Sequence, residues 1–251
     1  MRVCQRSGTE GASVKKDGLS CFFAKHSLFQ FKTTNPTGGA LSKRSFFLFS
    51  NFDLKKHIGR EESAAVQSII IQYAKDMCAG RLARGFDHVN RVYHLAKQLE
   101  DEYDDEVLLA ATYLHDIILT EPHQLQSAEK AEAVLHEVGF EPGKIAQVKE
   151  AILNHIPEGD PKSTEGKMLH DADMLDSLGM SGITRLAIGA FFWKGAKSLV
   201  DVLRHIKEYK ERAESHLILD RSRELAREKI GFMDKALKQL EKELSIVGIS
   251  E

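Results

Sequence analysis

The sequence predicts an all-α fold, arranged as a single helical bundle behind a disordered N-terminal leader. Three observations support this prediction. From about Glu61 onward, apolar residues recur every three or four positions, the spacing that places them on one face of a helix. No segment alternates apolar and polar residues with the β-branched side chains typical of strands. Glycine, proline and helix-capping residues stand at the ends of several of the periodic segments.

The N-terminal segment differs in composition from the rest of the 251-residue chain. Residues 1–50 carry eight Lys and Arg but only two acidic residues, a charge of +6, whereas the whole chain carries −2. They are also rich in Ser, Thr and Gly. An organellar transit peptide, a disordered tail and an over-extended translation start all fit this composition. We assign residues 1–55 to a flexible basic leader and residues 56–251 to one folded domain.

Nine segments with helical periodicity follow one another in that domain. The first ends at Gly80, a residue suited to the left-handed conformation that ends many helices. Asp87 and Ser127 can cap later helices. Residues 104–119 begin with acids, which suit a helix N-terminus, and then become almost wholly apolar, as expected of a buried central helix. The segments are residues 61–80, 86–100, 104–119, 127–140, 142–157, 167–179, 183–193, 199–215 and 222–244.

The overall composition argues against several classes of protein. With 35 basic and 37 acidic residues, the chain lacks the positive charge of a nucleic-acid binder. The three cysteines include no CxxC pair, which argues against disulfide scaffolds and cysteine zinc sites and fits a reducing intracellular compartment. No apolar stretch approaches the roughly 20 residues that span a bilayer, so we expect no membrane association. We expect a cytoplasmic protein, or an organellar one if the leader is a transit peptide.

Four of the predicted helices direct a His or an Asp toward the core. His88 and His115 share a helix face with apolar residues, and Asp116 lies beside His115. His155 and Asp173 continue the apolar stripes of two later helices. A single inward His is more often a core residue satisfied by hydrogen bonds, but four helices that do the same favour a site. Imidazole nitrogens and carboxylate oxygens without sulfur suit a divalent cation, which also compensates the buried negative charge.

The order of His88, the adjacent His115 and Asp116, and Asp173 resembles the H…HD…D arrangement of the HD-domain metal-dependent phosphohydrolases. The resemblance covers about residues 60–245. Two stretches make it more specific than the four ligands alone. DHVNRV is similar to the H-x-x-R-V opening of many small bacterial-type HD proteins. HDADMLDSLGMSGITR closely resembles the DADxLDxxGxxGxxR signature of the small predicted HD phosphohydrolase subgroup.

The resemblance implies a fold, a cofactor and a set of functional residues. The fold is a single HD-domain helical bundle. The metal ligands are His88, His115, Asp116 and Asp173, and the ion is Mn, Fe, Co, Ni, Zn or Mg, since such a ligand set does not select one of them. Asp116 would also orient the attacking water that the metal activates. His155 matches an inward histidine of many relatives and could act as general acid, contact phosphate or bind a second metal.

Two arginines match the arginines of the family signatures. Arg91 follows the first histidine and Arg185 ends the last signature, so each could hold a substrate phosphate through paired N–H donors. The alternative for both is a salt bridge to a nearby acid. Asp171 and Asp176 flank the matched ligand and are expected to orient ligands or the helix rather than bind metal.

Three further residues have two interpretations each. Glu121 and His123 follow the HD pair and could protonate a leaving oxygen, but polar residues are common in loops, and this second interpretation is favoured. Trp193 lies in the aromatic stretch AFFWKG, which is typical of a core or subunit contact. A nucleobase pocket is the less favoured interpretation of this stretch.

The sequence therefore predicts a metal-dependent phosphohydrolase that cleaves a phosphomonoester or phosphodiester of a nucleotide or another small phosphorylated metabolite. The main alternative is a non-catalytic HD module that binds metal or a small ligand and regulates a partner. The long charged segment of residues 222–244 has one apolar stripe, so we expect it to pack against the domain as its last helix. The same helix could instead form the interface of a homodimer.

Overall fold

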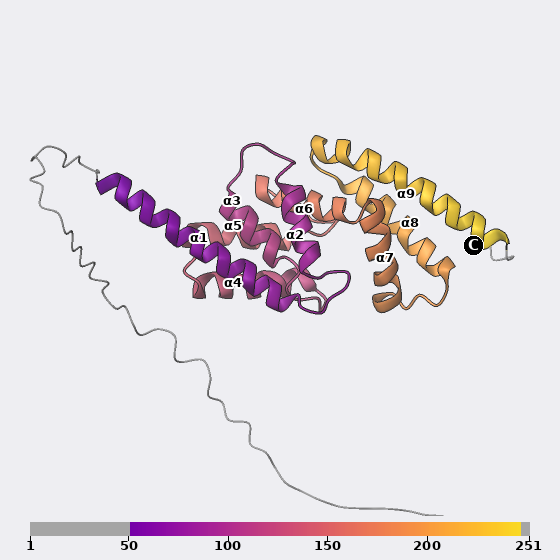
Figure 1. Ribbon diagram of the computed structural model, residues 1–251, viewed down its shortest axis with the longest axis horizontal. Coiled ribbons are helices and arrows are strands. Elements are labelled where there is room, and N and C mark those ends of the chain that lie inside the picture. Colours follow the sequence, from indigo (N-terminus) through magenta and orange to yellow (C-terminus); the bar gives the residue numbers. More distant parts are fainter. Residues whose placement is uncertain (1–50, 247–251) are drawn as a thin grey trace, which may run out of the picture. The chain divides into compact units, whose positions relative to one another are not determined.

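The computed structural model describes the backbone of residues 51–246 and the side chains of residues 62–246. This part of the chain contains nine helices and no strands, which confirms the all-α prediction (Figure 1). None of these helices is both long and apolar enough to cross a membrane. Residues 1–50 of the expected leader lie outside the described residues. The helices are α1 Asn51–Met77, α2 Phe86–Ala96, α3 Asp105–Leu114, α4 His123–Glu137, α5 Pro142–Leu153, α6 Thr164–Asp176, α7 Gly179–Trp193, α8 Leu199–His216 and α9 Asp220–Ile246.

Side-chain caps explain where three of the helices begin. Asp104 accepts hydrogen bonds from two backbone N–H groups in the first turn of α3. Ser163 accepts one from the N–H of Gly166 at the start of α6. At α8, Ser198 and Asp201 form a capping box, in which each side chain bonds the backbone N–H of the other. These caps satisfy N–H groups that have no partner within the helix.

Several expected helix ends are wrong. α1 begins at Asn51 rather than near Glu61. Gly85, not Asp87, stands at the N-cap of α2, and no side chain caps that helix. α4 begins four residues before Ser127, whose hydroxyl instead bonds the backbone N–H and carbonyl of Ile118 in the preceding loop. At Ser127, this contact with the preceding loop replaces the expected cap.

α6 is the central helix of the described region. It packs against α2, α3 and α5 on one side and against α7, α8 and α9 on the other, and it links the two groups of helices seen in Figure 1. Eleven of its thirteen residues are buried. Four of these, Glu165, Asp171, Asp173 and Asp176, are acidic, so each needs a partner to offset the cost of burial.

The HD pair lies at the end of α3 rather than in the middle of a longer helix. α3 ends at Leu114, His115 is its C-cap, and Asp116 follows in a turn. The guanidinium of Arg81, in the loop before α2, donates to the carbonyl oxygens of Asp116 and the next residue at 2.7 and 2.8 Å. In a continuing helix these carbonyl oxygens would accept from backbone N–H groups, and here Arg81 replaces those donors. The helix can therefore end at Leu114 although the following residues are apolar.

Candidate metal centre and adjoining cavity

The structure brings together His88, His115, Asp116 and Asp173, the four residues predicted to bind metal. The Nε2 atom of His88 lies 3.3 Å from Nε2 of His115, 3.5 Å from Oδ2 of Asp116 and 3.4 Å from Oδ1 of Asp173. All four side chains are buried. They come from α2, the end of α3, and α6, so the packing of these three helices creates the cluster.

Hydrogen bonds at the outer ring nitrogens fix the orientation of the imidazoles. Nδ1 of His115 and Nδ1 of His155 lie 2.8 and 2.6 Å from the backbone carbonyl oxygen three residues earlier. A carbonyl oxygen can only accept, so these Nδ1 atoms carry the proton and each Nε2 presents a lone pair. Nδ1 of His88 donates to Oδ2 of Asp176 at 2.8 Å. Histidines that bind metals are held in this way, with the outer N–H on a carboxylate or carbonyl.

The protonation states in the cluster also suit a cation. Burial lowers the pKa of His115, and it lowers the pKa of His155 to about 3, so both rings are neutral near pH 7. Burial acts to raise the pKa of Asp116, but Arg84 and the nearby imidazoles outweigh it and hold this pKa well below its usual range. The pKa of Asp173 is also lowered, because His88 and His115 together outweigh burial. Neutral imidazoles and ionised carboxylates are the forms that bind metals.

Two buried acceptors beside the cluster face each other without a hydrogen-bond partner in the described part of the chain. They are Oδ1 of Asp116 and Nε2 of His123, 3.6 Å apart. Nδ1 of His123 donates to Glu121 at 3.1 Å, so its Nε2 presents a lone pair. Nε2 of His155 lies 3.9 Å from the same oxygen. Facing acceptors without a donor destabilise the fold, and a cation between them would remove that cost. The donor set therefore fits a divalent metal.

Three groups of donor atoms in this region each lie within 4.8 Å of one another. Asp116 belongs to two of them, with one oxygen toward His88 and His115 and the other toward His123 and His155. The groups are His88, His115 and Asp116; His115, His155 and Asp173; and Asp116, His123 and His155. This geometry gives room for a second ion as well as a first.

The two arginines predicted to bind phosphate both form ion pairs with Asp176. Arg91 donates from Nε and Nη2 at 2.8 and 3.1 Å, and Arg185 donates from Nη1 at 2.7 Å. Burial opposes ionisation, but these donors and His88 hold the pKa of Asp176 below its usual range. The structure therefore contains, for both arginines, the salt bridge to a nearby acid that was the alternative to phosphate binding. Arg185 also lines the cavity described next, whereas Arg91 does not, so a phosphate contact by either stays a prediction.

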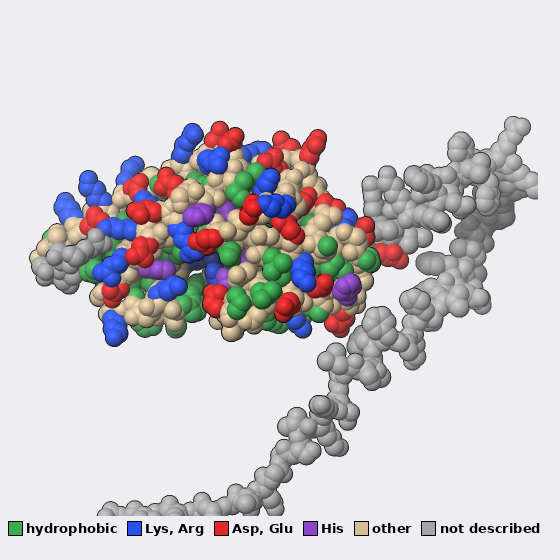
Figure 2. Space-filling view, turned by 180° about the vertical axis from the view of Figure 1, so that it is seen from behind, with side chains coloured by type: hydrophobic (Ala, Val, Ile, Leu, Met, Phe, Trp, Pro, Cys, Tyr) green, Lys and Arg blue, Asp and Glu red, His purple; other side chains and the backbone are tan. Residues whose placement is uncertain are grey.

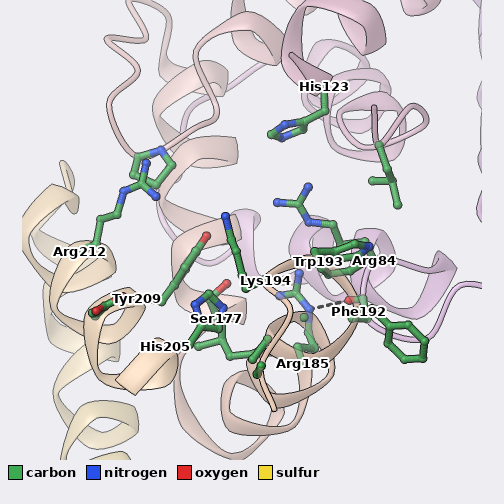
Figure 3. A pocket seen from close by; sticks show the side chains of 18 of the residues that line it. Arg84, His123, Ser177, Arg185, Phe192, Trp193, Lys194, His205, Tyr209 and Arg212 are labelled. Carbon is green, nitrogen blue, oxygen red and sulfur yellow. Dashed lines mark hydrogen bonds between the residues drawn. The ribbon is translucent and has the colours of Figure 1, made fainter. Parts of the chain in front are cut away.

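A cavity of about 1280 Å³ opens beside the cluster. Figure 3 shows His123 on one side of it and residues of α7, α8 and the loop between them on the other. His155 and Asp173 also line the cavity. The cations along it are Arg84, Arg185, Lys194, Lys197, Arg204 and Arg212, and the acids are Glu121, Glu158, Asp173, Asp201 and Glu208. Acidic and basic side chains are likewise interspersed over the face of the molecule that Figure 2 shows.

Of three further residues at this site, Arg84 left no sign in the sequence, and a site role was not favoured for His123 or Trp193. His123 is buried as the first residue of α4, so the favoured interpretation of it as an ordinary loop residue is wrong. Arg84 lies before α2, with Nε 3.4 Å from Oδ2 of Asp116. Trp193 lines the cavity with 53% of its surface exposed, so the assignment to the core is wrong, whereas a subunit contact stays a prediction. Neither Arg84 nor His123 falls on an apolar stripe, so helical periodicity gave no signal for either.

Comparisons with known proteins agree with the fold and with the position of the cluster. Residues 85–178 match the HD domain family, a range that holds His88, His115, Asp116, His155 and Asp173. The Bacillus subtilis uncharacterized protein YpgQ is 29% identical over 185 residues, which are 62% of this chain and 82% of YpgQ.

Solved structures show the same architecture. The crystal structure of Bacillus subtilis YpgQ in complex with ADP matches with a TM-score of 0.59 and 26% identity, over 72% of this chain and 96% of that one. A predicted HD superfamily hydrolase from an uncultured Thermotogales bacterium matches with a TM-score of 0.52 and 22% identity, over 70% and 91% of the two chains, and supports the fold alone. The H…HD…D residues that form the buried cluster all lie within residues 85–178, the range that matches the HD domain family, and the described part of the chain has the all-helical HD-domain fold.

Proposed function

We propose that this protein is a metal-dependent phosphohydrolase that cleaves a phosphomonoester or phosphodiester of a nucleotide or another small phosphorylated metabolite. The observation that carries the proposal is the buried His and Asp cluster beside a cavity lined with arginine and lysine. The cluster offers ligands for a cation, and the basic side chains offer charge for a phosphate.

His88, His115, Asp116 and Asp173 are the residues that would hold the metal, and His123 and His155 would hold a second ion on the other oxygen of Asp116. When bound, a divalent cation makes water more acidic near neutral pH and withdraws charge from phosphoryl oxygens. His and Asp donors accept Mn, Fe, Co, Ni or Zn, and with more difficulty Mg.

The residues around the cluster suggest how a phosphate would be held. Arg84 and Arg185 line the cavity within 3.4 Å of Asp116 and His88, respectively, so a phosphate close to the cluster would meet their remaining N–H donors. His155 fits the role of ligand better than that of general acid, because its Nδ1–H is bonded to a carbonyl and its Nε2 carries no proton near pH 7. The sequence-based assignment of proton donation to His155 is therefore not part of this proposal.

The choice of a nucleotide as one substrate class has support from a relative. YpgQ, 26% identical in its crystal structure, was crystallised in complex with ADP. ADP carries both a phosphoester and a phosphoanhydride, and the cavity of about 1280 Å³ here is larger than the roughly 300–1000 Å³ of sites for drug-sized ligands.

Turnover by the purified full-length chain, followed both as phosphate release and as loss of the intact substrate, tests the proposal. The protein would be stripped with a chelator, reloaded with Mn²⁺, Fe²⁺, Co²⁺, Ni²⁺, Zn²⁺ or Mg²⁺, and offered nucleotides and phosphorylated sugars. We expect turnover with at least one metal and its loss on adding chelator. Metal binding without turnover on any substrate would contradict the proposal and favour the non-catalytic HD module that regulates a partner.

A further inference from the structure

We propose that Trp193 is the platform on which a nucleobase stacks, so that the phosphate cleaved at this site belongs to a nucleotide rather than to a sugar phosphate. The inference rests on the proposed function in one respect, since it takes the cavity beside the metal cluster as the substrate site. It assigns a specificity-determining residue to that site.

Trp193 is unusually exposed for a residue of its type. Tryptophan is highly buried on average, yet 53% of Trp193 is accessible, and it lines the cavity together with Phe192. An aromatic surface left open inside a cavity is available to a ligand. Planar aromatic rings stack on such a surface through their faces, and every nucleobase has such a face.

The structure holds the Trp193 indole in a fixed place. Gly189 lies one turn earlier on α7, and a Cβ atom added there would be 3.1 Å from Cε3 and 3.2 Å from Cζ3 of the indole. The ring therefore lies against the helix backbone in the space that the missing side chain leaves. A ring already held in place loses little freedom when a ligand stacks on it, which favours binding.

Arg84 connects the platform to the metal cluster. Its guanidinium carbon lies 5.9 Å from the centre of the Trp193 ring, and its Nε lies 3.4 Å from Oδ2 of Asp116. Lys194, the next residue after Trp193, has no ion-pair partner among the described residues, and it points into the cavity in Figure 3. Trp193 and the Asp116 cluster thus lie on opposite sides of the cavity, with the Arg84 guanidinium between them. An aromatic face on one side, a cation in between and the His and Asp cluster on the other suit the base and phosphates of a nucleotide.

Trp193 is the only tryptophan in the chain, so intrinsic fluorescence reports on it alone. Full-length protein would be titrated with ADP, ribose 5-phosphate and inorganic pyrophosphate, with chelator present and again after loading with Mn²⁺, and affinities would be measured by calorimetry. We expect ADP to change the fluorescence and the two ligands without a base to leave it nearly unchanged. Trp193→Ala should weaken ADP binding about 5- to 100-fold and leave pyrophosphate binding within about twofold.

Three variants separate stacking from other roles. Phe191→Ala is the matched control, because Phe191 is on the same helix and 66% exposed but does not line the cavity, and it should leave ADP affinity unchanged. Trp193→Phe keeps an aromatic face and should retain most of the ADP affinity. Gly189→Val pushes the indole from its place and should weaken ADP binding with Trp193 still present.

Several results would overturn the inference. They are ADP affinity unchanged in Trp193→Ala, an equal loss for ADP and pyrophosphate, no ADP binding in either metal condition, or a change of sedimentation showing that Trp193 holds two subunits together. The inference and the proposed function can fail separately. If ADP stacks on Trp193 but no metal form hydrolyses any substrate, the stacking role stands and the proposed function is wrong. If ribose 5-phosphate and nucleotides are hydrolysed equally well, the proposed function stands and the preference for nucleotides is wrong.

Discussion

The two sides of the cavity differ in how their functional groups are satisfied. On the side of α2, α3 and α6, the polar side chains are buried and most are bonded within the protein, as Asp176 is to His88, Arg91 and Arg185. On the side of α7 and α8, Trp193 and Lys194 are exposed, and Lys194 has no ion-pair partner in the described region. The first side is thus organised mainly by bonds within the protein. On the second side Arg204 and Arg212 are also paired, with Asp201 and Glu158, but Trp193 and Lys194 stay open to a ligand.

This division suggests separate tasks for the two sides. Bonded ligands in a rigid core are suited to holding an ion in one geometry. Exposed aromatic and basic groups are suited to discriminating among ligands, because their contacts form only on binding. Substitutions on the first side should therefore change metal content, and substitutions on the second should change affinity.

Asp116→Ala is the strongest test of the first side. Asp116 lies within 3.9 Å of four imidazoles and Arg84, so we expect loss of bound metal and a fall in turnover on the order of 10³-fold, or ~4 kcal/mol. Metal analysis and phosphate release measure both effects. Asp87→Ala is the control, since that aspartate is exposed on α2. Metal content unchanged in Asp116→Ala would show that the cluster does not hold the ion.

Asp176→Asn tests whether the organisation of the first side matters beyond its ligands. The variant weakens the acceptor that orients His88, and loss of such an outer contact costs about 10- to 100-fold in metal affinity or activity. Competition with a metal chelator gives the affinity.

Asp171→Asn is the matched control for Asp176→Asn. Asp171 is equally buried on α6, but it accepts from the backbone N–H groups of Ile218 and Leu219 before α9, and from His170. We expect Asp171→Asn to lower the free energy of unfolding and to leave metal affinity unchanged. Equal losses of metal affinity in the two variants would mean that both act through general destabilisation.

Arg84→Met tests the residue that contacts both sides. Losing one charge-assisted contact to phosphate, worth ~1.5 kcal/mol, should lower kcat/KM about tenfold, mainly through KM. Metal content should change little if His and Asp alone hold the ion. Steady-state kinetics are compared with Arg227→Met, because Arg227 is exposed on α9 and does not line the cavity. If Arg84→Met loses its metal instead, Arg84 contributes to metal binding rather than to phosphate binding.

Lys144→Met should have the smallest effect, because it changes a partly exposed network away from the cavity. Lys144 lies 2.8 Å from Asp104 and 2.7 Å from Glu106. It lowers the pKa of Glu106 and, against burial, the pKa of Asp104. Carboxyls with a lowered pKa stabilise the fold above about pH 4, their unfolded value, and this stabilisation is lost as the pH falls through the lower folded value.

At pH 7, Lys144→Met should therefore reduce the free energy of unfolding by about 0.5–1 kcal/mol, with turnover unchanged. The difference from the natural protein should shrink between about pH 5 and pH 3. Urea unfolding at several pH values measures it, and the exposed Lys130→Met is the control. A difference that grows on acidification would show that the carboxyl pKa values are not lowered.

Sequence periodicity predicted the helices and the four inward His and Asp positions, because both depend on which face of a helix is apolar. It placed the end of α3 too late, because the apolar residues after Asp116 continue the helical pattern. In the structure, Arg81 from another segment donates to the carbonyl oxygens of Asp116 and Ile117. Arg84 and His123 lie outside the apolar stripes, so only tertiary packing places them in the site. For Trp193 the sequence favoured a core or subunit contact over a nucleobase pocket, because an aromatic stretch does not reveal whether a cavity lies beside it.

The three aspartates of α6 also limit how this protein can vary in length. Asp171 bonds the chain before α9, Asp173 lines the cavity, and Asp176 bonds groups from α2 and α7. Each added residue turns the following part of a helix by about 100°, so a single insertion within α6 would misdirect every acid beyond it. The loop around Gly195, between α7 and α8, has no such constraint from buried acids. Insertions and deletions among relatives should therefore be absent from α6 and tolerated in that loop, where they would reshape the cavity and leave the metal ligands in place.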